Sequence, residues 1–306
     1  QADKTAVNRD PYSDAGAGVS FDPVSSAQCD NTTYNQTNVD NGTSTCYKWN
    51  IIRYEGSNAV LQMDHSLITS EWLESDDYTA IKTSSNNINT SVSKLGDINS
   101  NIKVTKLALS YDNQEGPYTA MKNLAAATSN WTRVPLITNF THTPTLSIAS
   151  GNTYTKEFKT ISIQNGIYQN GNNTKTRIEN VRARMTTVDE IINIIEANNH
   201  ILSDYQGEAR TYHNDEYDYD YSVDNTSSFA LEDDNTYSWL FNNLSNLNYI
   251  DPKSAYWMMT QGYDFNGAWA VCKYAYTVQN NTKGGIVPWT YTTDVLGVRP
   301  VVTVPR

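Results

Sequence analysis

Clusters of basic residues are missing from this sequence. The chain has 306 residues with 22 Lys and Arg against 33 Asp and Glu, which gives a formal net charge of -11. Binding to a nucleic-acid backbone requires clustered cations that neutralise phosphates, so we expect no nucleic-acid partner. An acidic surface also keeps copies of a chain apart unless close packing or cations offset the charge.

Long apolar runs are also absent. No stretch approaches the roughly 20 apolar residues of a membrane-spanning helix, and the first 30 residues lack the basic and apolar regions of a secretion signal. The chain begins at Gln1. We therefore expect a trimmed product that touched a membrane only through a removed leader or anchor, and an extracellular or cell-surface location.

Cysteines are few. Cys29 and Cys46 flank a segment rich in Asn, Thr and Gly, which predicts a disulfide-closed surface loop in an oxidising compartment. The alternative is that both are reduced. Cys272 has no evident partner in the sequence and is expected to be a small buried residue of a strand.

Recognised catalytic and metal-binding motifs are missing as well. The four histidines are scattered, with no second His or Cys at zinc-ligand spacing. The sequence contains no G-x-S-x-G, no P-loop and no dinucleotide fingerprint. We therefore expect a protein that is not an enzyme and has no cofactor, apart from the calcium considered below.

The sequence that is present alternates short strand-like and helix-like segments, which is typical of an α+β protein. Residues 1–17 have no periodic pattern and are predicted to form an N-terminal arm, followed by a body over 18–306 with insertions at about 75–110, 136–180 and 200–235. Strands are expected at 18–23, 46–54, 58–64, 255–260, 268–274 and 295–304, and helices at 117–131, 187–198 and 237–244. Thr187 and Glu190 have the spacing of a capping box at the start of the middle helix.

The segment Asp215 to Asp224, DEYDYDYSVD, is the most unusual part of the sequence. In an extended conformation its tyrosines lie on one face and its carboxylates on the other. The carboxylates of Asp218, Asp220 and Asp224 suggest a calcium site, although their spacing does not match an EF-hand loop. An adhesive tyrosine face and a solvated loop are the alternatives.

Several short motifs of the sequence, taken together, resemble parts of a known fold. They are FDPVSSAQCD, CYKW and VLQMDHS near the N-terminus, and ARMTTVDEI, WLFNNL, YWMMT, AWAV and GVRPVVTV in the C-terminal half. Together they resemble the C-type-lectin-like (formylglycine-generating-enzyme-type) domain of prepilin-like and surface proteins of Gram-positive bacteria. The resemblance implies a C-type-lectin-like fold with short antiparallel strands, two to three helices and long inserted loops. The calcium-dependent sugar motifs and the paired catalytic cysteines of related domains have no match.

Within these motifs, Trp257 and Trp269 have apolar neighbours and are expected to be core anchors. Arg299 stands inside an apolar strand, where a charge needs a hydrogen-bonding partner. The GVRPV motif is therefore interpreted as part of the architecture.

The resemblance implies a non-enzymatic, pilin-like subunit of a surface appendage or filament, whose partners are other copies of itself. The alternative is an adhesin or receptor that binds a host or cell-surface protein or a glycan. Its site would lie in the loops between the last strands, because loops on a rigid scaffold carry recognition. The candidate ligand-binding residues are Tyr263, Asp264, Phe265, Asn266, Trp289 and Tyr291.

Overall fold

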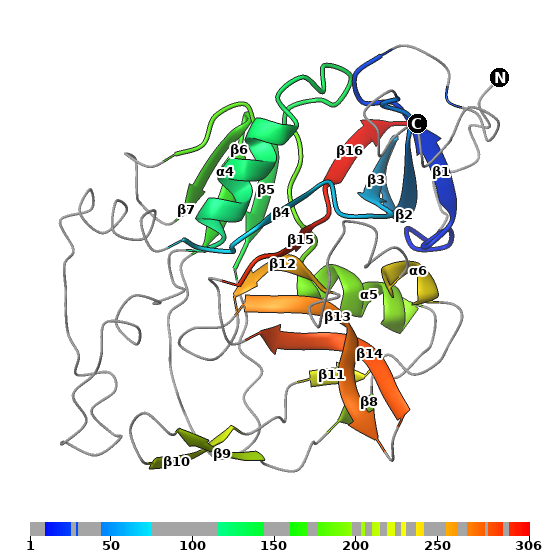
Figure 1. Ribbon diagram of the computed structural model, residues 1–306. Helices are drawn as coiled ribbons and strands as arrows, with labels where there is room; N and C mark the ends of the chain where they lie inside the picture. The colour runs from blue at the N-terminus through cyan, green and yellow to red at the C-terminus, as the bar shows by residue number, and fades with distance from the viewer. Residues whose placement is uncertain are drawn as a thin grey trace.

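The computed structural model describes most of the chain as an α+β protein (Figure 1). The described residues are 10–25, 29, 44–74, 116–143, 160–170, 177–197, 203–205, 210–214, 219–223, 228–230, 237–241, 255–261, 268–278, 281–289 and 294–306. The α+β class expected from the sequence is confirmed. The insertion expected at 75–110 lies outside the described residues.

One sheet contains the predicted N-terminal strands. Its order is β1-β2-β3-β16, with antiparallel neighbours throughout. The turn between β2 and β3 contains Gly56 at φ 57°, a left-handed conformation that glycine adopts at little cost. The bounds are β1 Gly18–Phe21, β2 Tyr47–Glu55, β3 Asn58–Met63 and β16 Val301–Pro305.

A second, three-stranded sheet forms from the segment expected to be an insertion at 136–180. Its strands are β5 Asn139–His142, β6 Ile161–Gln164 and β7 Ile167–Asn170, in that order. The segment is β-rich as predicted. Ile161, Ile163 and Tyr168 belong to the main hydrophobic core together with α4 (Tyr118–Ala127), so this segment packs on the core.

The largest sheet has seven strands in the order β4-β15-β12-β13-β14-β11-β8. Helices α5 and α6 contact it at β12 and β13, and α5 also contacts β2, so α5 lies between the two larger sheets (Figure 1). A separate pair joins β9 and β10. The bounds are β4 Ile68–Ser70, α5 Val188–Ala197, β8 Ser203–Tyr205, β9 Arg210–Asn214, β10 Tyr219–Val223, β11 Ser228–Ala230, α6 Ser238–Phe241, β12 Ala255–Gln261, β13 Ala268–Val278, β14 Asn281–Trp289 and β15 Leu296–Val298.

This sheet includes part of the predicted insertion at 200–235, because strands β8 and β11 extend it. It also corrects one expectation. The predicted strand at 295–304 is two strands, because β15 pairs with β4 and β12 whereas β16 pairs with β3. Arg299 and Pro300 separate them. Proline has no N–H to donate to a ladder.

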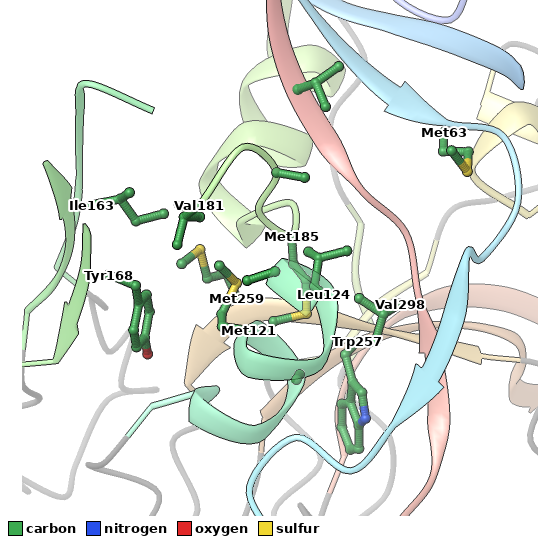
Figure 2. Packing of buried hydrophobic residues seen from close by; sticks show 14 of the residues in the cluster. Met63, Met121, Leu124, Ile163, Tyr168, Val181, Met185, Trp257, Met259 and Val298 are labelled. Carbon is green, nitrogen blue, oxygen red and sulfur yellow. The ribbon is translucent and has the colours of Figure 1, made fainter. Parts of the chain in front are cut away.

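The hydrophobic core has two clusters that meet on β12. Ala255, Trp257 and Met259 pack into the first cluster, whereas Tyr256 and Met258 pack into the second, because alternate residues of a strand point to opposite faces. Figure 2 shows side chains of α4, β6, β7 and β12 converging in the first cluster. Trp269 belongs to the second cluster, and the predicted anchor role of both tryptophans is confirmed.

The N-terminal segment from Asp10 onwards packs against the body. The Gly16 N–H donates to the Ile51 carbonyl at 2.8 Å, and the Tyr54 N–H donates to the Pro11 carbonyl at 2.8 Å. Tyr12 packs on the second core cluster. A Cβ on Gly16 would lie 2.6 Å from the Trp239 indole nitrogen. The part of the predicted arm that the structure describes therefore packs on the body.

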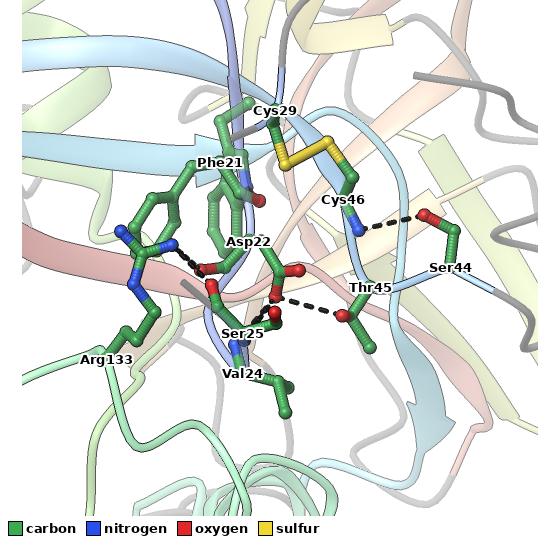
Figure 3. Close-up of a disulfide and its surroundings, with 10 residues drawn as sticks. Phe21, Asp22, Val24, Ser25, Cys29, Ser44, Thr45, Cys46 and Arg133 are labelled. Carbon is green, nitrogen blue, oxygen red and sulfur yellow. Dashed lines mark hydrogen bonds between the residues drawn. A yellow bond between two sulfur atoms is a disulfide. The ribbon is translucent and has the colours of Figure 1, made fainter. Parts of the chain in front are cut away.

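The predicted disulfide between Cys29 and Cys46 is present (Figure 3). Next to it, the Asp22 carboxylate accepts hydrogen bonds from the Val24 and Ser25 N–H groups, both at 2.8 Å, and from the Thr45 hydroxyl at 2.9 Å. The bond indicates an oxidising, secreted environment. None of the described helices is long and apolar enough to cross a membrane.

Candidate functional site

A buried polar cluster lies where β2, β5, α5 and β12 meet. It starts from the predicted capping box. The Glu190 N–H donates to the Thr187 hydroxyl oxygen at 3.2 Å, and the Glu190 carboxylate accepts from the Thr187 N–H at 3.0 Å. Both bonds satisfy N–H groups that have no partner inside the helix. The predicted start of the helix is confirmed.

The Glu190 carboxylate also binds two arginines. Arg184 donates to both carboxylate oxygens, at 2.8 and 2.5 Å, and Arg53 of β2 donates to one of them. The Arg184 guanidinium also lies 4.2 Å from the centre of the Phe140 ring. Arg184 and Glu190 are 4% and 6% exposed, so this network is shielded from solvent.

These contacts set the ionisation of the network. Burial alone would raise the pKa of Glu190, but Arg184 and Arg53 outweigh it and lower the pKa from 4.5 to about 2. Burial would lower the pKa of Arg53, but Glu190 and Glu55 reverse this and the pKa is raised. The carboxylate and the guanidinium therefore stay charged at neutral pH.

A second chain of contacts joins His142 of β5 to α5 and β12. The Thr260 hydroxyl oxygen accepts from the Val188 N–H at 2.9 Å and lies 3.1 Å from Nε2 of His142. Nδ1 of His142 lies 3.7 Å from the Asp189 carboxylate. Burial lowers the pKa of His142, although Asp189 and Glu190 oppose it. A neutral ring that accepts from Thr260 and turns its Nδ1–H towards Asp189 fits this geometry.

The order hydroxyl, imidazole, carboxylate is also that of a nucleophile with its base. Here, however, the Thr260 hydroxyl is occupied by the first turn of α5, and Thr260 is 4% exposed. This series of contacts through His142 therefore orients the end of β12 relative to α5 and β5. Among the described residues, no three His, Cys, Asp or Glu side chains are grouped so that they could hold a metal ion.

The predicted ligand-binding segment begins where this cluster ends. Gln261, the last residue of β12, pairs with Ala268, which in turn pairs with Trp289 at the end of β14. The backbone thus brings Trp289 and the two residues that flank 262–267 to one end of the sheet. Tyr263, Asp264, Phe265, Asn266 and Tyr291 themselves lie outside the described residues.

The candidate calcium residues are placed in part. Asp220 lies in β10, opposite His213 of β9, and the extended conformation predicted for this segment is found over 219–223. Asp218 and Asp224 lie outside the described residues.

A polar face on the three-stranded sheet was not identified from the sequence. Residues opposite one another on antiparallel strands share a face. One row is Thr141, Ser162 and Gln169, and the next is Asn139, Gln164 and Ile167. A depression of about 210 Å³ on this face is lined by Ser162, Gln164, Asn165, Ile167, Gln169 and Arg177. The signal was the alternation in ISIQ and IYQN, where every second residue is buried.

Comparison with protein-family models, curated proteins and solved structures finds no match to the chain.

Proposed function

We propose that the chain is a non-enzymatic protein of the extracellular surface that assembles with copies of itself into a filament. The observation that carries this proposal is the outer edge of β1, which ends the four-stranded sheet. An edge strand has peptide groups that can pair with a strand of another molecule. The nearby disulfide supports an extracellular location.

The hydrogen bonds of β2 identify which peptide groups of β1 point outward. The Lys48 carbonyl accepts from the Asp64 N–H at 3.1 Å, on the β3 side, whereas the Ile51 N–H donates to Ala17, on the β1 side, at 3.0 Å. Peptide groups alternate in direction along an antiparallel strand. Gly18 and Ser20, which lie opposite Asn50 and Lys48, therefore direct their peptide groups away from β2.

The composition of this edge suits contact between acidic chains. Two copies with a net charge of -11 repel each other, but the sequence of β1, GVSF, carries no charge. Backbone pairing along β1 would bring the copies together through peptide groups. If β1 pairs with a different strand of the next copy, the contact is head-to-tail, and it produces an open filament when its rotation does not close a ring.

Ser20→Pro tests the proposal, because proline removes the outward N–H and is tolerated on an edge strand whose N–H faces solvent. We expect filaments of the wild-type chain in electron micrographs and dispersed particles of the variant, with an unchanged melting temperature. Ser20→Ala keeps the N–H and should keep the filaments. Dispersed wild-type particles at high concentration, or filaments of Ser20→Pro, would contradict the proposal.

We also propose, as the alternative, an adhesin or receptor that binds through the end of the seven-stranded sheet. It is supported by the register that joins Gln261, Ala268 and Trp289, because Gln261 and Ala268 flank the 262–267 segment in the sequence. Replacing Tyr263 and Trp289 together with Ala should remove binding to host-cell or glycan surfaces. Unchanged binding would refute this location of the site.

A further inference from the structure

Most side chains that line the depression on the outer face of the β5–β6–β7 sheet are uncharged and can form hydrogen bonds. Gln164, Asn165 and Gln169 each present an amide, with both donor and acceptor atoms, and Ser162 presents a hydroxyl. Gln164 and Asn165 are exposed, while Ser162 and Gln169 are half-buried. The strand backbones fix the spacing of these groups.

Two further residues complete the lining. Ile167, half-buried, offers apolar surface beside the amides. Arg177 is the cation of the lining, and its guanidinium already pairs with Glu179 at 3.0 Å. Among the lining residues there is no carboxylate. The site therefore has close to zero net charge on a chain whose net charge is -11.

The chemistry of this lining selects a class of ligand. Because Glu179 balances the charge of Arg177, the site offers an anion no net positive charge, and the acidic chain repels it. The adjacent hydroxyl groups of a sugar each donate and accept hydrogen bonds, and so do the amides of the lining. The C–H face of the sugar ring matches the apolar surface of Ile167. The volume of about 210 Å³ is below the roughly 300–1,000 Å³ of sites for drug-sized ligands, which favours one ring.

We propose that this depression binds one ring of a neutral saccharide, with Gln164 and Gln169 as the principal hydrogen-bonding residues. Gln164 lies opposite Asn139 and Ile167, and Gln169 lies opposite Ser162. The two amides thus come from different strands of one hairpin and approach the ring from two sides. This binding does not depend on filament assembly, and it differs in location from the loops at the end of the seven-stranded sheet.

Saturation-transfer NMR on the full chain tests the proposal, with glucose, galactose, mannose and N-acetylglucosamine and their oligomers of up to four rings as probes. We expect at least one neutral sugar to bind. The variant Gln164→Ala/Gln169→Ala should weaken this binding by about tenfold or more, because a lost hydrogen-bonding partner costs about one order of magnitude. Glucuronic acid should bind more weakly than glucose.

Three variants make the result specific. Asn193→Ala removes an exposed amide from α5 and should leave sugar binding unchanged, as should Tyr263→Ala/Trp289→Ala. Gln169→Glu keeps the side-chain shape but replaces the amide donor with a charge, and should weaken binding. The proposal is overturned if no probe binds, or if the double glutamine variant binds the sugar as tightly as the wild type does. It is also overturned if that variant abolishes self-association, measured by light scattering, and leaves sugar binding unchanged.

Discussion

The Glu190→Ala variant is expected to lose about 3–5 kcal/mol of unfolding free energy, since removing one partner of a buried ion pair leaves an uncompensated charge. Glu190 accepts from Arg184 and Arg53 and also caps α5 through the Thr187 N–H. Its removal leaves Arg184, 4% exposed, without its carboxylate partner. Chemical denaturation at pH 7 measures the change.

Glu179→Ala is the matched control for this substitution. Glu179 also pairs with an arginine, Arg177, at 3.0 Å, but the two side chains are 58% and 51% exposed. Exposed ion pairs contribute at most about 1 kcal/mol, so this variant should remain close to the wild type. Equal losses in the two variants would show that the Glu190 network is not shielded as the structure indicates.

Features that depend on nearby residues could be predicted from the sequence. The capping box needs only the spacing of Thr187 and Glu190, and the β2–β3 hairpin needs only two apolar runs around Gly56. The disulfide joins two cysteines separated by 17 positions. In each case the interacting groups lie within one turn, hairpin or loop, so their spacing carries the information.

Features that depend on strand pairing between distant segments could not be predicted. Arg53 reaches Glu190 across a separation of 137 positions, and only the packing of α5 on β2 brings them together. The separation of β15 from β16 likewise depends on β4 and β3, which supply their different partners. A continuous apolar run cannot show which sheet each of its residues will join.

The same limit applies in part to the candidate sites. The polar face of β6 and β7 lies within one hairpin and has a local signal, the alternation in ISIQ and IYQN, but its extension onto β5 depends on the pairing of Ser162 with Thr141. The end of β12 is similar, since His142 reaches Thr260 across 118 positions. Single residues of these sites are ordinary Ser, Thr, Gln and His, and only their placement distinguishes them.

Acid should destabilise the protein through Glu190, and this is the second large effect. Its pKa is about 2 in the folded chain, against an ordinary value of 4.5. Because the unfolded chain binds this proton more tightly, the stabilisation is fully present above about pH 5 and is lost as the pH falls through 2. The shift corresponds to about 3 kcal/mol. Denaturation curves at a series of pH values from 7 to 2 measure it.

Comparison of the wild type with Glu190→Gln separates the effect of Glu190 on stability in acid from the effects of the other carboxylates. Glutamine keeps an oxygen that can accept from the Thr187 N–H but does not titrate, so the variant should be less stable at pH 7 and should lose less stability between pH 5 and 2. The other acidic residues cancel in the difference. If both chains lost the same free energy over this range, the carboxylate would not be held ionised by its arginines.

His142 also makes the protein less stable as the pH falls, but at a higher pH than Glu190 does. Burial lowers its pKa below 6.5, so the unfolded chain again binds the proton more tightly, and stability falls as the pH drops below about 6.5. His142→Gln keeps an acceptor for the Thr260 hydroxyl and should flatten the profile between pH 7 and 5 without affecting the lower range. His142→Gln thus tests the range from pH 7 to 5, and Glu190→Gln tests the range from pH 5 to 2. The two ranges can be assigned separately because the buried cluster holds Glu190 charged and His142 neutral.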